Sequence, residues 1–206
     1  CVSFTKNAPP VPIAHLPWCT DAPIDLLPPI IHRKNETFPL EGQALTRLVL
    51  DIRKRGIGAA FRPQSTIIMA VHNAAKALHI SLPLIFRNTA SCSELILLLD
   101  QCTDSSLETV FERLNTFQQS RIVRVRLLAQ DTPIWESASE NIMMSISDPL
   151  HFYITVQPDN LIQEFAWDLQ LSRPLRAFDD IFSVSGMIGH QLGARTPTTA
   201  FLKNRP

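Results

Sequence analysis

Cysteine and histidine are the residues most suited to chemistry in this chain. Cysteines stand at positions 1, 19, 92 and 102, and histidines at 15, 32, 72, 79, 151 and 190. Cys92 and Cys102 flank an apolar run; if that run is one helix, they lie about 15 Å apart along its axis. A disulfide needs Cα atoms within about 7 Å, and no CxxC pair is present. We therefore expect free, structural thiols, which favours an intracellular location.

Cys1 has two chemical interpretations. An N-terminal cysteine can act as a nucleophile with its own α-amino group as base, but Pro9, Pro10 and Pro12 follow where such a nucleophile would open a strand. Cys1 would alternatively be the lipid anchor of an envelope lipoprotein. We expect neither role and keep the lipid-anchored envelope protein as a further alternative.

The histidine spacing does not predict a metal site. His72 and His79 are two helical turns apart, so they would share a helix face but lie about 10 Å from each other. No HxxxH or HExxH pair is present. The glycine-spaced segment 186–193 lacks the Lys-Ser/Thr pair of a phosphate-binding loop, and its spacing is not GxGxxG. The sequence thus predicts no metal and no cofactor.

A small, hydrolase-like enzyme is the main alternative to a non-catalytic role. Its polar residues would converge only in three dimensions, around Asp179, His190 and Cys92. No catalytic motif supports this alternative, and we interpret Asp179 as an acid near a helix start that has no catalytic role.

The charge balance argues against general attraction to nucleic acid. Lysine and arginine total 19, as do aspartate and glutamate, whereas nonspecific phosphate binding needs excess basic charge. Any nucleic-acid contact would use a local basic patch formed by Arg53, Lys54, Arg55, Arg124 and Arg126. We interpret residues 53–55 instead as cations at a helix C-terminus.

Residues 1–40 form an apolar, proline-rich arm. Its prolines prevent helix propagation and central-strand pairing, yet it is too apolar for a solvated tail. We expect it to lie extended along this chain's own core or along other protein subunits. The predicted anchors are Trp18, Leu26, Leu27, Ile30 and Ile31.

The elements that would position these residues follow from hydrophobic periodicity. A 3.6-residue period predicts helices over 43–55, 65–79, 91–101 and 105–118, the last with a capping box beginning at Ser105. Alternation predicts strands over 121–128, 134–137, 141–147, 150–156 and from about 164 to 171, followed by a short helix over 175–184. No apolar run approaches the length of a membrane span.

Together these patterns predict an α+β fold. We expect about four helices (43–118) packed on a C-terminal antiparallel sheet (121–171), within one domain of residues 41–206 preceded by the arm. The leading functional hypothesis is a non-catalytic subunit of a larger protein assembly that binds its partners through the arm.

Overall fold

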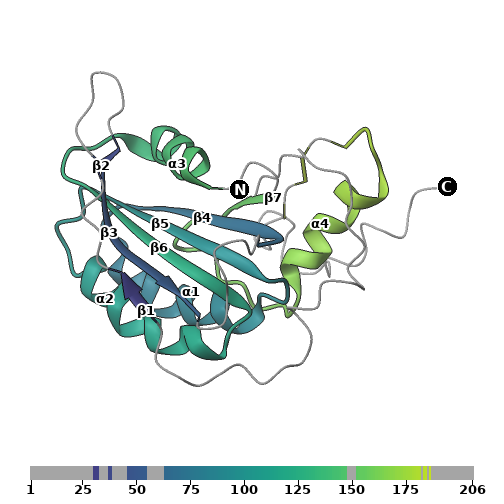
Figure 1. The fold of residues 1–206 in the computed structure, drawn as a ribbon, viewed down its shortest axis with the longest axis horizontal. Helices are drawn as coiled ribbons and strands as arrows, with labels where there is room; N and C mark the ends of the chain where they lie inside the picture. The colour runs from purple at the N-terminus through teal and green to yellow at the C-terminus, as the bar shows by residue number, and fades with distance from the viewer. Residues whose placement is uncertain are drawn as a thin grey trace, which may run out of the picture.

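The structure is a computed structural model in which helices and strands alternate along the chain (Figure 1). It describes residues 30–32, 37–38, 46–54, 63–147, 152–181, 183–184 and 186. The elements are β1 (Ile30–His32), β2 (Thr37–Phe38), β3 (Thr46–Arg53), β4 (Ser65–Val71), α1 (Ala75–Asn88), β5 (Ser93–Asp100), α2 (Ser106–Arg113), the 3-10 helix η2 (Leu114–Gln119), β6 (Ile122–Gln130), α3 (Trp135–Ile146), β7 (Phe152–Thr155) and α4 (Trp167–Ala177).

The sheet is mixed, and its centre is parallel. The strand order is β1-β3-β6-β5-β4-β7, with β2 also paired to β3. β4, β5, β6 and β7 run parallel to their neighbours in this set, whereas β3 is antiparallel to β6. The prediction of helices combined with a sheet is confirmed, but the prediction of an antiparallel sheet is wrong. The physical reason is that helical crossovers separate β4, β5, β6 and β7 in sequence, as parallel pairing requires.

The central strand β5 explains one wrong helix prediction. All eight of its residues are buried, because helices cover both faces of the sheet. A strand buried on both sides reads as a continuous apolar run, and Leu95–Leu99 therefore lack the alternation that marks a half-exposed strand.

Some of the other predicted elements are confirmed and others are wrong. The helix over 105–118 and the strands over 121–128 and 150–156 are confirmed, as α2 with η2, β6 and β7. The helix over 43–55 is wrong, because β3 occupies it with Leu48, Leu50 and Ile52 buried on alternate positions. The segment 65–79, predicted as a helix, forms β4 and the start of α1. The two strands predicted over 134–137 and 141–147 are replaced by the single helix α3. The region from 164 to 184 contains α4 where a strand was predicted.

The sheet separates the core into two layers, one on each of its faces, and helices cover both. α1, α2 and η2 cover one face, where Phe86 and Phe117 meet edge to face with ring centroids 6.0 Å apart. α3 covers the other face, where Ile142 and Met143 pack on β-strand residues such as Ile96. Figure 1 shows α3 on the side of the sheet opposite α1 and α2. The parallel strands are therefore packed between two apolar layers.

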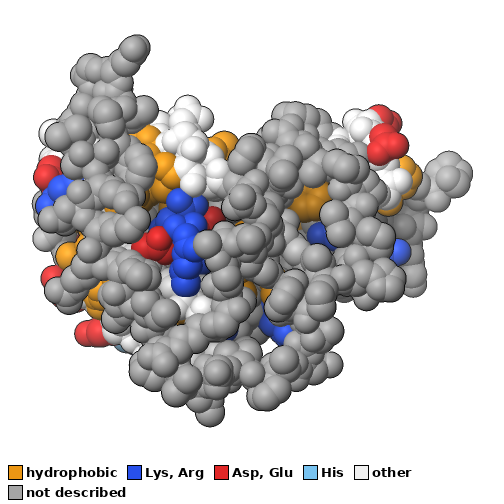
Figure 2. All heavy atoms as spheres, viewed as in Figure 1, with side chains coloured by type: hydrophobic (Ala, Val, Ile, Leu, Met, Phe, Trp, Pro, Cys, Tyr) orange, Lys and Arg blue, Asp and Glu red, His pale blue; other side chains and the backbone are white. Residues whose placement is uncertain are grey.

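The sheet face that α3 covers also carries a row of ion-paired side chains, which we call the charge ladder. Glu94 of β5 pairs with Arg126 of β6 at 2.8 Å and with Arg124 at 3.3 Å. Arg124 in turn binds Asp51 of β3 through two hydrogen bonds of 2.6 and 2.8 Å. Figure 2 shows basic and acidic side chains touching on the visible face, beside hydrophobic ones. Arg126 also donates to the carbonyl of Ile146 (2.8 Å), which ties the end of α3 to the sheet.

α4 is anchored by a buried carboxylate. Asp168 accepts hydrogen bonds from the backbone N–H groups of Ala90 (3.0 Å) and Ser91 (2.8 Å), just before β5 begins. Ala166, which precedes the helix, has a positive φ of 59°. These long-range contacts explain why local periodicity misassigned this segment. None of the described helices is long and apolar enough to cross a membrane, as the sequence predicted.

Candidate binding pocket at the carboxyl ends of the parallel strands

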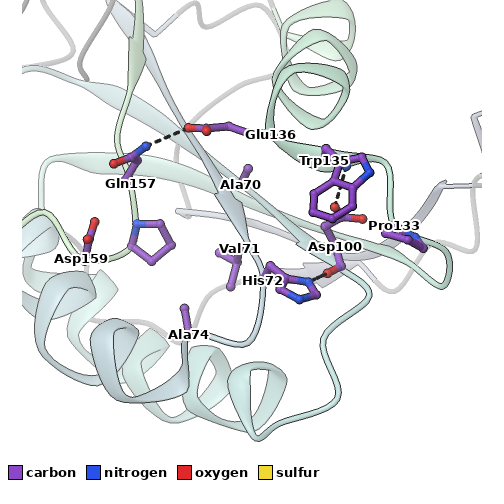
Figure 3. A pocket seen from close by; sticks show the side chains of 11 residues that line it. Ala70, Val71, His72, Ala74, Asp100, Pro133, Trp135, Glu136, Gln157 and Asp159 are labelled. Atoms are coloured by element: carbon purple, nitrogen blue, oxygen red, sulfur yellow. Dashed lines mark hydrogen bonds between the residues drawn. The ribbon is translucent and has the colours of Figure 1, made fainter.

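A cavity of about 470 Å³ opens where the parallel strands end (Figure 3). Its walls come from the ends of β4 and β5 and from the segments that follow β6 and β7. The chain moves from β4 to β5 to β6 on one side and then returns to place β7 on the other side of β4. Such a reversal of strand order is where ligands bind in open α/β sheets.

The turn after β4 is organised by His72 and Asn73. The Nδ1–H of His72 donates to the carbonyl of Asp100 (2.7 Å), and the amide of Asn73 donates to Nε2 of His72 (3.2 Å). A carbonyl can only accept, so the proton of the first bond lies on Nδ1, and the amide donor makes Nε2 the acceptor of the second. The Asn73 oxygen accepts the backbone N–H of Thr103 (2.7 Å), which couples this turn to the loop after β5.

Asp100, the last residue of β5, is buried and accepts hydrogen bonds from the first residues of the α3 region. Its carboxylate oxygens receive the N–H of Ile134 (3.0 Å) and the N–H of Trp135 (2.8 Å). An acid at a helix N-terminus satisfies orphan donors and complements the helix dipole. Asp100 therefore fixes the point at which α3 enters the pocket wall.

Trp135 contributes a large aromatic surface to the same wall. Its side chain is 75% exposed, although tryptophan is normally among the well-buried residues. Its backbone lies in the left-handed region with φ at 66°. Figure 3 shows the indole at one side of the cavity, near Asp100 and His72.

Backbone strain is concentrated at this edge of the sheet. Among the described non-glycine residues, four have positive φ: Asn73, Gln101, Trp135 and Ala166. Asn73 lies two residues after β4, Gln101 directly after β5, and Trp135 at the start of α3. L-residues disfavour this conformation, and such strain clusters at functional sites. Three of the four positions therefore lie near the edge of the sheet where the pocket opens, and Trp135 lines it.

The opposite wall of the pocket is polar. Gln157 donates to Glu136 (3.1 Å), which links the segment after β7 to the first turn of α3. Asp159 is exposed at the rim, as Figure 3 shows. The described residues of the lining include three carboxylates and one histidine but neither lysine nor arginine. Among the described residues, no group of three or more potential ligands is placed to hold a metal ion.

The N-terminus of α1 is already satisfied by an acid. Asp104 accepts the backbone N–H of Ala75 (3.0 Å), and Ser106 Oγ accepts that of Ala74 (3.0 Å). Burial opposes ionisation of Asp104, but hydrogen bonds from Ser106 and Ala75 outweigh it and hold its pKa below the ordinary value. The predicted capping box is wrong, because Ser105 makes no side-chain cap; the carboxylate of Asp104 receives the N–H of Ser106 instead (3.0 Å).

The predicted partner-binding residues all belong to the arm. Trp18, Leu26 and Leu27 lie outside the described residues. Ile30 and Ile31 belong to β1, opposite Arg53 and Ile52 of β3. The arm as a partner-binding segment, and the division at residue 40, stay predictions.

The basic residues predicted for a local patch are engaged within the fold. Arg124 and Arg126 belong to the charge ladder, and Arg53 lies 3.8 Å from Asp51. Lys54 donates to the carbonyls of Gln118 and Ser120. Arg53 and Lys54 lie at the end of a strand, so their interpretation as helix-terminal cations is wrong. Arg55 lies outside the described residues.

The predicted enzyme constellation is not assembled in the described part of the chain. Cys92 is disulfide-bonded, whereas Cys102 is free, so the expectation of free thiols is wrong for Cys92. Asp179 is exposed after α4, and His190 lies outside the described residues, as does Cys1. Of the segment 186–193, only Gly186 is described.

Among the residues that line the pocket, only His72 was considered from the sequence for a chemical role, and it was rejected as a metal ligand. The available signal was the polar residue that ends each apolar run: His72 after 65–71, Asp100 after 93–99, and Gln157 after 152–156. Recognising it required knowing that these runs are parallel strands, whose carboxyl ends meet at one edge.

Comparisons with protein-family models and with curated proteins find no match. Among solved structures, the chain is similar to the mannosyltransferase PcManGT from Pyrobaculum calidifontis, in complex with GDP-Man and Mn²⁺, at a TM-score of 0.42 and 16% identity, covering 50% of this chain and 29% of that one. It is also similar to S. aureus TarS at a TM-score of 0.44 and 16% identity, covering 54% and 20%. The chain thus spans less than a third of either structure, and the likeness is too distant to indicate function.

Proposed function

We propose that this protein binds a nucleoside-containing small molecule in the pocket at the carboxyl ends of β4, β5 and β7. The observation that carries the proposal is the position of the cavity at the reversal of strand order, the place where doubly wound sheets bind nucleotides. Its volume of about 470 Å³ lies within the range of small-molecule sites.

The side chains around the cavity suit the parts of a nucleoside. Trp135 offers an exposed aromatic face, on which a planar base stacks. The carboxylates of Glu136 and Asp159 are acceptors for the hydroxyl groups of a ribose. The pocket therefore combines an apolar surface for a ring with acceptors for sugar hydroxyls.

The charges around the cavity restrict how phosphate groups would be accommodated. The lining residues that the structure describes include no lysine or arginine, and the N–H groups at the start of α1 are already bonded to Asp104 and Ser106. A phosphate-bearing ligand would thus face carboxylates directly. Mg²⁺ is commonly held by one or two carboxylates together with substrate phosphates. We therefore expect nucleotides to bind through a divalent cation, and nucleosides to bind without one.

Calorimetric titration with a panel of nucleosides and their diphosphates, each with Mg²⁺ or with EDTA, tests this proposal. We expect at least one nucleoside to bind in both buffers and its diphosphate to bind more tightly with Mg²⁺. Asp159→Asn should weaken the Mg²⁺-dependent part, whereas Glu112→Gln, an exposed acid on α2, should not. Absence of binding by every nucleoside and diphosphate would show that the proposal is wrong.

The role of an assembly subunit, predicted from the arm, is a separate proposal. It concerns residues 1–40, and a ligand pocket at the sheet edge is compatible with it. It rests on the sequence pattern of the arm alone.

A further inference from the structure

We infer that Trp135 is the residue on which the ligand's planar ring stacks, and that Asp100 is the positioning residue that holds it in place. The inference rests on the proposed function, because it names the residue that would recognise the ring. It starts from a residue whose identity neither packing nor backbone preference explains.

Packing does not account for a tryptophan at this position. The Trp135 side chain is 75% exposed, whereas Trp167, at the equivalent first position of α4, is 5% exposed and donates to Thr89. An exposed indole contributes little apolar burial to the fold. Burial in the core therefore does not explain a tryptophan at position 135.

Backbone preference also opposes a tryptophan here. With φ at 66°, position 135 is one that glycine adopts freely and that a residue with a bulky side chain adopts under strain. The hydrogen bond from its N–H to Asp100 would form equally well with glycine, because only the backbone takes part. Glycine at position 135 would relieve the strain and keep the hydrogen bond, and the only feature it would lack is the indole.

Asp100 holds the backbone at the start of α3 and the imidazole of the loop after β4. Its carboxylate binds the N–H groups of Ile134 and Trp135, and its carbonyl accepts the Nδ1–H of His72. In Figure 3, Trp135 and His72 lie near each other with Asp100 beside them. Because the carboxylate holds the backbone N–H groups of Ile134 and Trp135, it fixes the position from which the indole projects into the pocket wall.

Trp135→Gly tests the stacking role, and Ala166→Gly is its matched control. Both residues have positive φ, but Ala166 lies before α4 and does not line the pocket. Relief of backbone strain should raise Tm by about 2–4 °C in each variant. Nucleoside affinity should fall at least about tenfold in Trp135→Gly, since base stacking is lost, and stay unchanged in Ala166→Gly.

Asp100→Asn tests the positioning role, with 5-fluorotryptophan incorporated to give a ¹⁹F signal for each tryptophan. Trp135→Phe identifies the signal of Trp135 and should keep most of the affinity. Asparagine turns a donor toward one of the two N–H groups, so the Trp135 signal should shift even without ligand, and nucleoside affinity should fall. An unchanged Trp135 signal and affinity in Asp100→Asn would overturn the positioning role.

The failures of the two proposals are distinguishable. If the unaltered protein binds a nucleoside and Trp135→Gly binds it equally well, the stacking inference is wrong and the proposed function stands. If Trp135→Gly lowers Tm while Ala166→Gly raises it, the indole stabilises the fold and the inference is again wrong. If the unaltered protein binds no nucleoside, the proposed function is wrong and the stacking role falls with it.

Discussion

At the scale of single residues, Lys54 is a cation placed in an unfavourable environment. It directly follows β3, its ammonium lies 5.2 Å from the centre of the Phe117 ring, and it donates to carbonyls at the end of η2. Burial, together with the nearby charge of Arg121, lowers the pKa of Lys54 to about 8. The ammonium is therefore a structural link rather than part of a basic surface.

This lowered pKa predicts a pH dependence of stability. Between about pH 8 and pH 10.5 the unfolded chain keeps the Lys54 proton while the folded chain releases it, so the unfolded state binds more protons. The contribution of Lys54 to the free energy of unfolding should consequently rise with pH across this window. Urea denaturation of the protein and of Lys54→Met at several pH values measures the contribution as a difference. A flat or falling difference would contradict the assignment.

At the scale of elements, the outcome of sequence reasoning depended on whether the deciding contacts are local. β6 and α2 were predicted because their own side chains alternate or repeat along one face. β5 was missed because burial on both faces removes the alternation of Leu95–Leu99. α3 was missed because its start is fixed by Asp100, 35 residues away in sequence from Trp135. The pocket could not be predicted for the same reason, since four separate loops form it.

The charge ladder predicts a marked difference between single and paired substitutions. Arg126→Leu leaves Glu94 buried with only the longer contact to Arg124, and should lower the free energy of unfolding by about 3 kcal/mol. Glu94→Leu combined with Arg126→Leu removes both charges and should cost much less. Urea denaturation of the two variants checks this prediction.

The exposed pair of Arg47 and Asp131 provides the control for this comparison. Its side chains are 55% and 74% exposed, so Arg47→Leu should change the free energy of unfolding by at most about 1 kcal/mol. Equal losses in the single and paired ladder variants would mean that the ladder is not coupled.

At the scale of the whole molecule, the disulfide of Cys92 predicts sensitivity to reduction. A native disulfide typically contributes about 2–4 kcal/mol, so a reductant should lower the urea midpoint of the protein. Cys92→Ser should remove this response, whereas Cys102→Ser, which alters the free thiol, should keep it. Intact mass before and after reduction and alkylation counts the bonded thiols. A midpoint that ignores the reductant would contradict a structural disulfide.

The assembly of the pocket from loops beyond the strand ends has an evolutionary consequence. The core lies between the helices, while the residues facing the cavity lie at the ends of β4 and β5 and in the segments after β6 and β7. Under the proposed function, substitutions in one loop would therefore alter ligand preference with little change in the core, Val71 being a lining residue that also belongs to it. Under the proposed function, related proteins would change specificity through single loop substitutions, and a substitution to glycine at position 135 would also relieve the backbone strain there.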